Sequence, residues 1–228
     1  MRRAPLFADR VEAGRRLAAA IMHYDLFHPV VFALPRGGVT VAAEVAAALG
    51  APLDLVLVRK LGVPAQSELA FGAVVDGGEA ETVLNEDVVA AAGVTPGQIS
   101  VARVRELAEI ERRRETYLKG RVRPDPRGRD AIVIDDGLAT GATARAAIHA
   151  LRRRGAARVI LAVPVGAADS VEKMRREVDE LICLEQPEPF FGIGAWYEDF
   201  HQLSDAEVVA MLDAATVSAR PQPASTAG

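Results

Sequence analysis

The 228-residue sequence contains a single cysteine, Cys183, so it cannot form an intramolecular disulfide. The aliphatic neighbours of Cys183 favour a buried strand thiol rather than a nucleophile. Aromatic residues make up only 5% of the chain. Long apolar runs are also lacking, because the longest ones, Val30–Leu34 and Leu53–Val58, fall far short of the roughly 20 residues that cross a bilayer. We therefore expect a soluble protein without disulfides or a membrane span.

The sequence also lacks an excess of positive charge. Its net charge is -4 and its pI is about 5.7, so it has no overall basic field. This argues against nucleic acid or an anionic membrane as a partner. Near the N-terminus, Asp9, Arg10 and Glu12 interrupt the apolar segment that a signal peptide requires, which predicts a cytoplasmic protein. Half of the residues are apolar, enough for one sizeable core. We expect one domain over residues 1–215 and a disordered tail over 216–228.

Short β-branched segments alternate with Ala-rich segments of helical periodicity along most of the chain. The pattern predicts strands at residues 30–34, 53–58, 131–134, 159–163 and 181–184, and helices at 11–24, 39–49, 143–153, 170–176 and 205–215. This alternation is typical of an α/β fold with a mostly parallel sheet and helices on both faces. Such sheets bind ligands at the carboxyl ends of their strands.

The middle of the chain has a different character. Residues 71–75 and 82–84 flank Asp76-Gly77-Gly78, which predicts a small hairpin insertion. The segment Thr95-Pro96-Gly97-Gln98 carries a capping residue, a first-turn proline and a capping-box glutamine. A long charged helix to about Leu118 should follow, with its Arg and Glu residues on a solvated face.

The most informative segment is the strand 131–134 with the loop Asp135-Asp136-Gly137-Leu138-Ala139-Thr140-Gly141-Ala142-Thr143 that follows it. A buried strand here delivers two carboxylates and then a small-residue loop that opens a helix. The amides of Ala139, Thr140, Gly141, Ala142 and Thr143 could surround a phosphate, helped by the helix dipole. The carboxylates could accept hydrogen bonds from the hydroxyls of a neighbouring diol. An ordinary helix cap is the alternative, but the acids and the Thr-Gly-Ala-Thr run occur together.

This loop resembles the signature of the type I phosphoribosyltransferases, in which two acidic residues follow an apolar strand and precede a Thr-Gly-x-Thr-like loop. The resemblance extends from about Val30 to Pro189, and the layout looks most like stand-alone predicted phosphoribosyltransferases without a settled acceptor. It implies a C-terminal hood over the sheet. It also implies that Ala139–Thr143 bind the 5-phosphate of phosphoribosyl pyrophosphate, while Asp135 and Asp136 bind the ribose hydroxyls.

Two further segments occupy positions where this family has other working parts. The turn Pro35-Arg36-Gly37-Gly38 is similar to the pyrophosphate loop, although a plain strand-to-helix turn would look much the same. Arg59 and Lys60 resemble the start of the mobile catalytic loop, although two solvated cations at a strand end are the alternative. If this segment is the catalytic loop, the charges of Arg59 and Lys60 would contact the diphosphate.

The resemblance also implies Mg²⁺, since a divalent ion can neutralise the charge of a diphosphate leaving group. No dense carboxylate cluster indicates an all-protein metal cage. We therefore expect Mg²⁺ held chiefly by substrate oxygens, with Asp135 or Asp136 as a ligand directly or through water. A homodimer is expected from the resemblance alone.

The acceptor should lie under the segment 184–200, which holds the aromatic residues Phe190, Phe191, Trp196 and Tyr197. Aromatic faces suit a stacked heterocyclic base, although each ring could equally serve in packing. Many 6-oxopurine enzymes of the family have an acid where this chain has Ala139, which weakens a hypoxanthine or guanine assignment. The adenine and orotate branches are more similar here. Of the histidines, only His201 lies beside the hood.

The leading hypothesis is therefore a transferase that moves the 5-phosphoribosyl group to a nitrogen heterocycle and releases pyrophosphate. Two alternatives keep the same fold, because fold does not establish catalysis. One is a regulator that binds phosphoribosyl pyrophosphate or a nucleotide as a signal. The other is an enzyme that acts on a different phosphosugar.

Overall fold

The computed structural model describes residues 4–64, 66–76 and 81–218 of the chain. Its main sheet has five parallel strands in the order β2-β1-β6-β7-β8. These strands are β1 (Val30–Ala33), β2 (Leu53–Leu55), β6 (Asp130–Ile134), β7 (Arg158–Val165) and β8 (Glu180–Glu185). Every residue of β1 and β6 is buried, as expected for strands covered on both faces.

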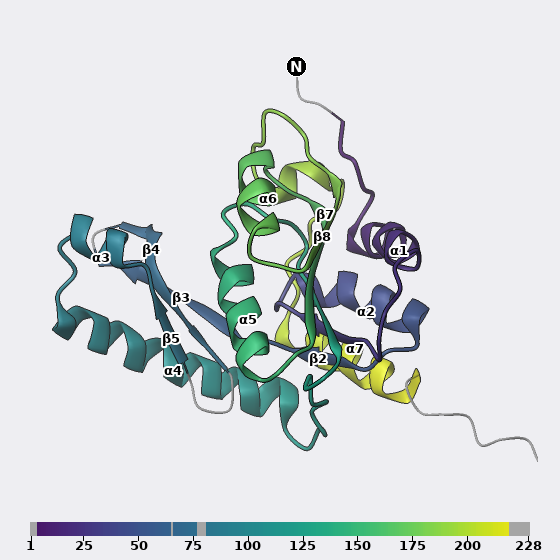
Figure 1. Ribbon diagram of the computed structural model, residues 1–228, viewed down its shortest axis with the longest axis horizontal. Helices are drawn as coiled ribbons and strands as arrows, with labels where there is room; N and C mark the ends of the chain where they lie inside the picture. The colour runs from purple at the N-terminus through teal and green to yellow at the C-terminus, as the bar shows by residue number, and fades with distance from the viewer. Residues whose placement is uncertain (1–3, 65, 77–80, 219–228) are drawn as a thin grey trace, which may run out of the picture.

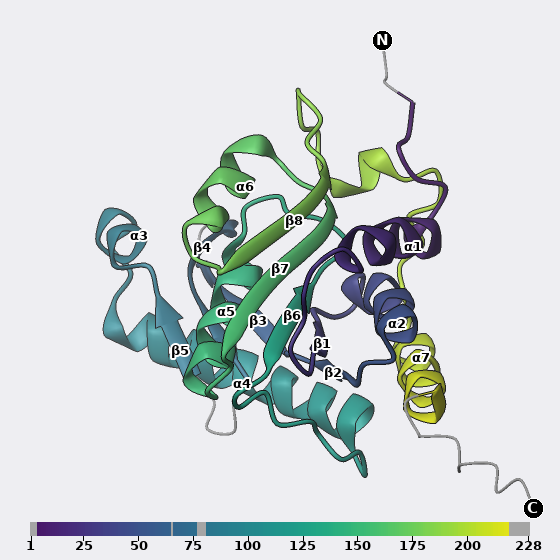
Figure 2. The same ribbon diagram turned by 45° about the vertical axis from the view of Figure 1, so that its right-hand side comes forward.

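Helices cover both faces of this sheet (Figures 1 and 2). One face carries α1 (Arg10–Ile21), α2 (Gly38–Leu49) and α7 (Asp205–Ser218), which pack with Val31, Ala33 and Ile132. The opposite face carries α5 (Ala142–Arg153) and α6 (Ala168–Arg175), which pack with Phe32 and Val133. The alternation of strand side chains between two apolar layers follows from the period of two along a strand.

A second, antiparallel sheet projects from the first, and the long helix α4 lies along it (Figure 1). Its strands are β3 (Val58–Val63), β4 (Gln66–Val75) and β5 (Glu81–Leu84), and the short helix α3 (Glu86–Ala91) follows. The predicted hairpin between residues 71–75 and 82–84 is present as β4 and β5, while its Gly77-Gly78 turn lies outside the described residues.

The strand predicted at Leu53–Val58 is wrong as one element. The structure divides it, because β2 ends at Leu55 and β3 begins at Val58 in the other sheet. Val56 and Leu57 are buried between the two strands. A run that is apolar except for Asp54 therefore continues through a change of sheet.

Helix α4 (Pro96–Leu118) begins and ends where its capping pattern predicted. The Thr95 hydroxyl accepts a hydrogen bond from the Gln98 amide at 3.3 Å, and the Gln98 side chain accepts one from the Thr95 amide at 2.9 Å. The helix packs on the second sheet through Ile110, which is 2% exposed. The predicted solvated face is only partly confirmed, because Glu106 is 5% exposed and pairs with Arg59 of β3, and Arg114 pairs with the buried Asp76.

A buried ionic network joins the two sheets. Arg123 lies in the linker after α4 and reaches Asp54 in β2 at 3.0 Å and Asp76, just after β4, at 3.1 Å. Arg114 of α4 also pairs with Asp76, which has no exposed surface. Burial raises the pKa of Asp54, against the opposing effect of Arg123. The network fixes the second sheet and α4 to the main sheet.

The hood is formed by the chain after β8, including a short 3₁₀ helix at Ile193–Trp196. The N-terminal segment pairs with it, because the amides of Leu6 and Phe7 donate to the carbonyl of Trp196 at 2.9 and 3.1 Å. Phe7, Trp196 and Tyr197 share a small core with Ala13 of α1. The N-terminal segment and the hood, which are distant in the sequence, thus lie side by side.

The α/β class, the parallel sheet, the hairpin insertion and the hood are confirmed. Helix α7 continues to Ser218, three residues beyond the predicted end at Ala215, and the rest of the predicted tail lies outside the described residues. Within the described part of the chain, no helix is both long and apolar enough to cross a bilayer.

Candidate functional site

The topology of the main sheet marks one place for a ligand. Helix α2, after β1, covers one face, whereas α5, after β6, covers the other. Because β1 and β6 are neighbours, the chain leaves their carboxyl ends in opposite directions, and sheets of this kind bind ligands in the crevice at such a point. The predicted pyrophosphate loop follows β1, and the predicted phosphate loop follows β6. The fold therefore brings two segments that are distant in the sequence to the same crevice.

The phosphate loop is anchored at its start and open at its tip. The Leu138 amide donates to the Val165 carbonyl at 2.8 Å, and the Leu138 carbonyl accepts from the Ala167 amide at 2.9 Å. Ala139 and Thr140 are exposed. Gly141 caps α5 with a φ of 77°, a left-handed conformation that glycine adopts without strain. Because Gly141 has no side chain to cap α5, the first-turn amides remain available for an anion.

The two acids differ in their surroundings. Asp136 is 8% exposed and pairs with Arg10 of α1, whose Nη2 lies 2.7 Å from Oδ2 of Asp136. Asp135 keeps some exposed surface, and its Oδ1 accepts from the Asp136 amide at 2.9 Å. Burial of its carboxyl group, followed by the charge of Asp136, raises the pKa of Asp135 well above its ordinary value. The pair therefore places one carboxylate that is paired with a cation beside one carboxyl group whose pKa is raised.

The predicted pyrophosphate loop touches both acids. A Cβ atom on Gly37 would lie 1.9 Å from Oδ2 of Asp136, and one on Gly38 would lie 2.9 Å from Cα of Asp135. Both glycines are thus required by close approach rather than by an unusual φ. The peptide bond between Pro35 and Arg36 is cis. The Arg36 side chain is exposed.

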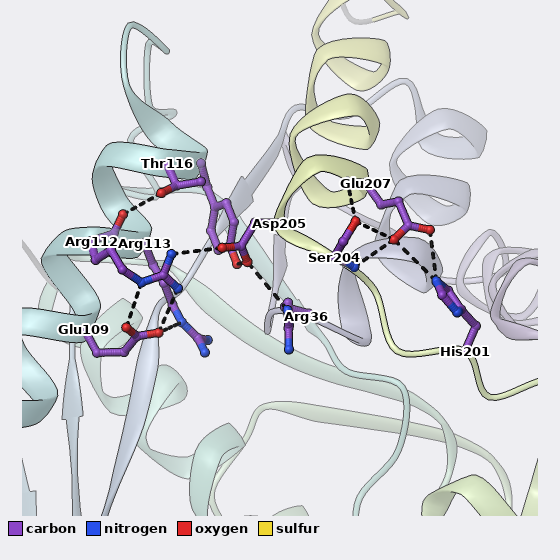
Figure 3. Close-up of polar contacts among 10 residues, drawn as sticks. Arg36, Glu109, Arg112, Arg113, Thr116, His201, Ser204, Asp205 and Glu207 are labelled. Atoms are coloured by element: carbon purple, nitrogen blue, oxygen red, sulfur yellow. Dashed lines mark hydrogen bonds and ion pairs between the residues drawn. The ribbon is translucent and has the colours of Figure 1, made fainter.

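Polar contacts that share the carboxylate of Asp205 connect Arg36 to α4 (Figure 3). Nη1 of Arg36 lies 3.6 Å from Oδ1 of Asp205, at the start of α7. Asp205 is also bound by Arg112 at 2.9 Å and by the hydroxyl of Tyr117. These donors, with Tyr117 first, lower the pKa of Asp205, so this carboxylate remains ionised. Asp205 was not predicted as part of the site.

Arg59 and Lys60, the two cations predicted to act in the catalytic loop, have different surroundings in β3. Arg59 points to α4, where its Nε lies 2.8 Å from the carboxylate of Glu106, which is 5% exposed. Lys60 follows in the same strand and is exposed. The structure therefore commits Arg59 to an internal ion pair and leaves Lys60 accessible.

The four aromatic residues predicted to bind the acceptor also divide. Trp196 and Tyr197 are 2% and 4% exposed, and the Tyr197 hydroxyl donates to the Asp136 carbonyl at 2.6 Å. Phe191 is 71% exposed, while Phe190 is partly buried with its ring centre 6.4 Å from that of Trp196. Trp196 and Tyr197 thus act in packing, whereas Phe190 and Phe191 keep more exposed surface. His201 is exposed, and its Nε2 lies 3.1 Å from Glu207.

The comparisons with known proteins agree with this geometry. The family model described as phosphoribosyl transferase domain matches residues 7–199, which include both loops, the hairpin and the hood.

The chain belongs to the type I phosphoribosyltransferases.

Among its relatives, a protein of Mycobacterium tuberculosis with the provisional name phosphoribosyl transferase is 48% identical over 210 residues, which is 92% of this chain. The match covers 47% of that protein, so the chain spans about half the length of the curated relatives it matches. A protein of Thermus thermophilus of known crystal structure is 39% identical, with a TM-score of 0.76 over 90% of this chain and 97% of that one. The uracil phosphoribosyltransferase of Lactobacillus gasseri is 35% identical over 85 residues, which is 36% of this chain and 40% of that protein.

Two residues of this phosphoribosyltransferase site escaped the sequence-based prediction. Arg10 lies 126 positions before Asp136, its partner, and Asp205 lies on a helix that the pattern placed but could not orient. Arginine and aspartate are common at protein surfaces, so the residue type alone did not indicate a role in the site. Arg10 lay at the start of the predicted first helix, and an arginine there is the only signal that the sequence offered.

Proposed function

We propose that this chain transfers the 5-phosphoribosyl group of phosphoribosyl pyrophosphate to a ring nitrogen of a nucleobase-like heterocycle and releases pyrophosphate. The observation that carries the proposal is the close contact of Gly37 and Gly38 with Asp135 and Asp136. This contact joins a phosphate loop, diol acceptors and a second anion-binding loop in one crevice. A 5-phosphate, a ribose and a diphosphate follow each other in the same order along the substrate.

In this proposal, each part of the substrate has its own contacts. The amides of Ala139–Thr143 bind the 5-phosphate, the acid pair accepts from the ribose hydroxyls, and the amides of 35–38 with Arg36 bind the diphosphate. The acceptor nitrogen attacks ribose C1 with its lone pair, and the bond from C1 to the diphosphate oxygen breaks. Pyrophosphate leaves with that electron pair, and the nitrogen loses its proton. Holding the two reactants in line lowers the barrier.

Magnesium fits this arrangement as an ion carried largely by the substrate. Among the described residues, no three His, Cys, Asp or Glu side chains gather into a metal site. The residues that would hold Mg²⁺ are Asp135 or Asp136, directly or through water. When bound, the ion would neutralise negative charge on the leaving diphosphate.

The acceptor and the hairpin complete the proposal. Phe190 and Phe191 are proposed to offer the ring faces against which a base stacks, because Trp196 and Tyr197 are used in packing. Lys60 is proposed as the hairpin cation that reaches the diphosphate, since Arg59 is held by Glu106. A homodimer, which the family resemblance implies, and a cytoplasmic location are also part of the proposal.

The test is pyrophosphate release from phosphoribosyl pyrophosphate and Mg²⁺ with a panel of purine and pyrimidine bases. Release should depend on one base or a small group, and Asp135→Asn should lower kcat/KM by roughly a hundredfold, the scale of losing one preorganised charge in an active site. Asp87→Asn, an exposed aspartate of α3, is the matched control and should not change the rate. Tight binding of phosphoribosyl pyrophosphate without release would favour the regulator, and no binding would overturn the proposal.

A further inference from the structure

Helix α6 and the chain that leads into it lie against the phosphate loop. Leu138 and Gly166 form a parallel β-bridge, and the Leu138 carbonyl accepts from the Ala167 amide at 2.9 Å. The next carbonyl of the loop, that of Ala139, accepts from the hydroxyl of Ser170 in α6. Two consecutive carbonyls of the loop are therefore bound by the segment between β7 and α6.

The same side of α6 makes a second contact with the loop. A Cβ atom on Gly141 would lie 3.0 Å from Sδ of Met174, which is 1% exposed. Ser170 and Met174 are four positions apart, so they are neighbours on one side of the helix. Helix α6 thus supports the loop at Ala139 and at Gly141, on either side of Thr140.

The Ser170 hydroxyl donates outside its own helix. A serine in the first turn of a helix commonly bonds to a nearby backbone group of that turn. Helix α6 has Ala167 as its N-cap, without a side-chain capping bond, and Ser170 follows three residues later. Its hydroxyl instead reaches a carbonyl that lies 31 positions earlier in the sequence. Capping of α6 therefore does not account for this serine.

This hydrogen bond orients one peptide group at the tip of the loop. The peptide bond between Ala139 and Thr140 is trans, and the carbonyl and amide of a planar trans peptide point in opposite directions. Because the Ala139 carbonyl points to Ser170, the Thr140 amide points away from α6. Both residues of the tip are exposed, so water could bind this carbonyl in other orientations if the serine hydroxyl were absent.

The orientation of this peptide group matters for an anion. Successive amides attract an anion through their partial positive charge, whereas a carbonyl oxygen carries a partial negative charge. A turned peptide group would therefore replace an attractive group with a repulsive one. The following residue, Gly141, has a φ of 77°, and glycine offers little steric resistance to such a turn.

We propose that Ser170 is a positioning residue of the phosphate loop, which holds the Ala139 carbonyl against α6 and thereby keeps the Thr140 amide turned toward the 5-phosphate of the substrate. The serine acts through the peptide group and does not contact the substrate itself. The identity of the ligand rests on the proposed function, whereas the orientation of the loop is a property of the free protein.

The first measurement titrates the isotope-labelled full chain with inorganic phosphate and follows the amide resonances of Thr140 and Gly141. These resonances report on the loop itself, so phosphate bound elsewhere does not enter the result. Ser170→Ala should weaken this binding by about three- to tenfold, the scale of one hydrogen bond. Ser170→Thr keeps a hydroxyl and should restore much of the affinity. Ser100→Ala, the same change at an exposed position of α4, is the matched control and should bind as the wild type does.

Kinetics separate positioning from a contribution to stability alone. Binding that is lost equally in the ground state and the transition state raises KM without changing kcat. Because the 5-phosphate is not the reacting end of the substrate, Ser170→Ala should raise the KM for phosphoribosyl pyrophosphate by a similar factor and leave kcat nearly unchanged. A lower Tm together with wild-type phosphate affinity and wild-type KM in the folded variant would show a purely structural role and overturn the inference.

Failure of this inference and failure of the proposed function give different results. If the wild type binds phosphate at the loop but releases no pyrophosphate with any base, the transferase proposal fails, and the phosphate affinities of the Ser170 variants still decide the role of the serine. If the wild type is active and Ser170→Ala keeps its phosphate affinity and KM, only the role of Ser170 fails. No shift of Thr140 and Gly141 in the wild type would also overturn the inference, because the loop would then not bind an anion.

Discussion

Asp205 shares one carboxylate among three partners, Arg36 of the pyrophosphate loop and Arg112 and Tyr117 of α4. Its negative charge lies 3.6 Å from the arginine that is proposed to meet a diphosphate. A ligand anion must therefore compete with a carboxylate that is already present.

We predict that Asp205→Asn tightens the binding of inorganic pyrophosphate. Two unit charges about 4 Å apart interact by about 1 kcal/mol in water, so the gain should be roughly fivefold. The substitution should also lower the free energy of unfolding by about 1–2 kcal/mol, because Tyr117 loses a charged acceptor. Calorimetry and urea denaturation measure the two effects. Asp213→Asn, at an exposed position of the same helix, should show neither, and weaker pyrophosphate binding in Asp205→Asn would contradict the prediction.

Individual site residues could be predicted from the sequence where they act together within one short segment. Asp135, Asp136 and the loop to Thr143 are contiguous, so their types and order predict a phosphate loop without knowledge of the fold. Arg10 could not be found in this way, because its partners lie 126 and 191 positions away. Nor could the strand pattern alone reveal that Arg59 would meet Glu106 of α4.

Helices and strands were predictable where local chemistry decides them. The capping box at Thr95 and Gln98 fixes the start of α4, and Gly50 ends α2 with a φ of 59°. The division of the run Leu53–Val58 was not predictable, because its residues are apolar almost throughout. Only the neighbouring strands, β1 for Leu53–Leu55 and β4 from Val58 onward, decide where one sheet ends and the other begins.

Helix α7 begins with a capping pair whose strength depends on pH. The Ser204 hydroxyl and amide donate to Glu207 at 2.6 and 2.7 Å, and these bonds lower the pKa of Glu207 to about 2 from 4.5. Because the pKa is lower in the folded state, the carboxylate stabilises the protein above pH 4.5, and this contribution is lost as the pH falls toward 2.

We therefore predict that Glu207→Gln lowers Tm at pH 7 and that its difference from wild type disappears near pH 2. Thermal unfolding followed by circular dichroism between about pH 7 and 2 gives the measurement. Glu198→Gln, an exposed glutamate outside the cap, should follow the wild type. A difference in Tm that stays constant with pH would show that the charge of Glu207 is not involved.

At the scale of the whole molecule, the two sheets are joined through Arg123, Asp54 and Asp76. Both acids are almost fully buried, at 3% and 0% exposure. Removing their shared arginine would leave two buried carboxylates with fewer partners, and this is the costly way to break a buried ion pair.

We predict that Arg123→Met lowers the free energy of unfolding by about 3–5 kcal/mol. Urea denaturation gives the value, and Arg127→Met, an exposed position of the same linker, provides the comparison. A loss below about 1 kcal/mol would show that the sheets are held together by apolar packing alone. The parallel order of the main sheet was predicted from alternation, but this junction was not, since it joins residues from three distant segments.

The contact between Arg10 and His201 also bears on the synthesis of the chain. Its two residues are 191 positions apart in the sequence. Strand β1 likewise pairs with β6, which is synthesised about a hundred residues later. At about 5–20 residues per second, a ribosome needs roughly 10–40 s to deliver the second partner after the first. For roughly 6–25 s of that interval, α1 is present without Asp136, the carboxylate that neutralises Arg10 in the folded protein. The contact between α1 and the hood can thus form only after His201 has been synthesised.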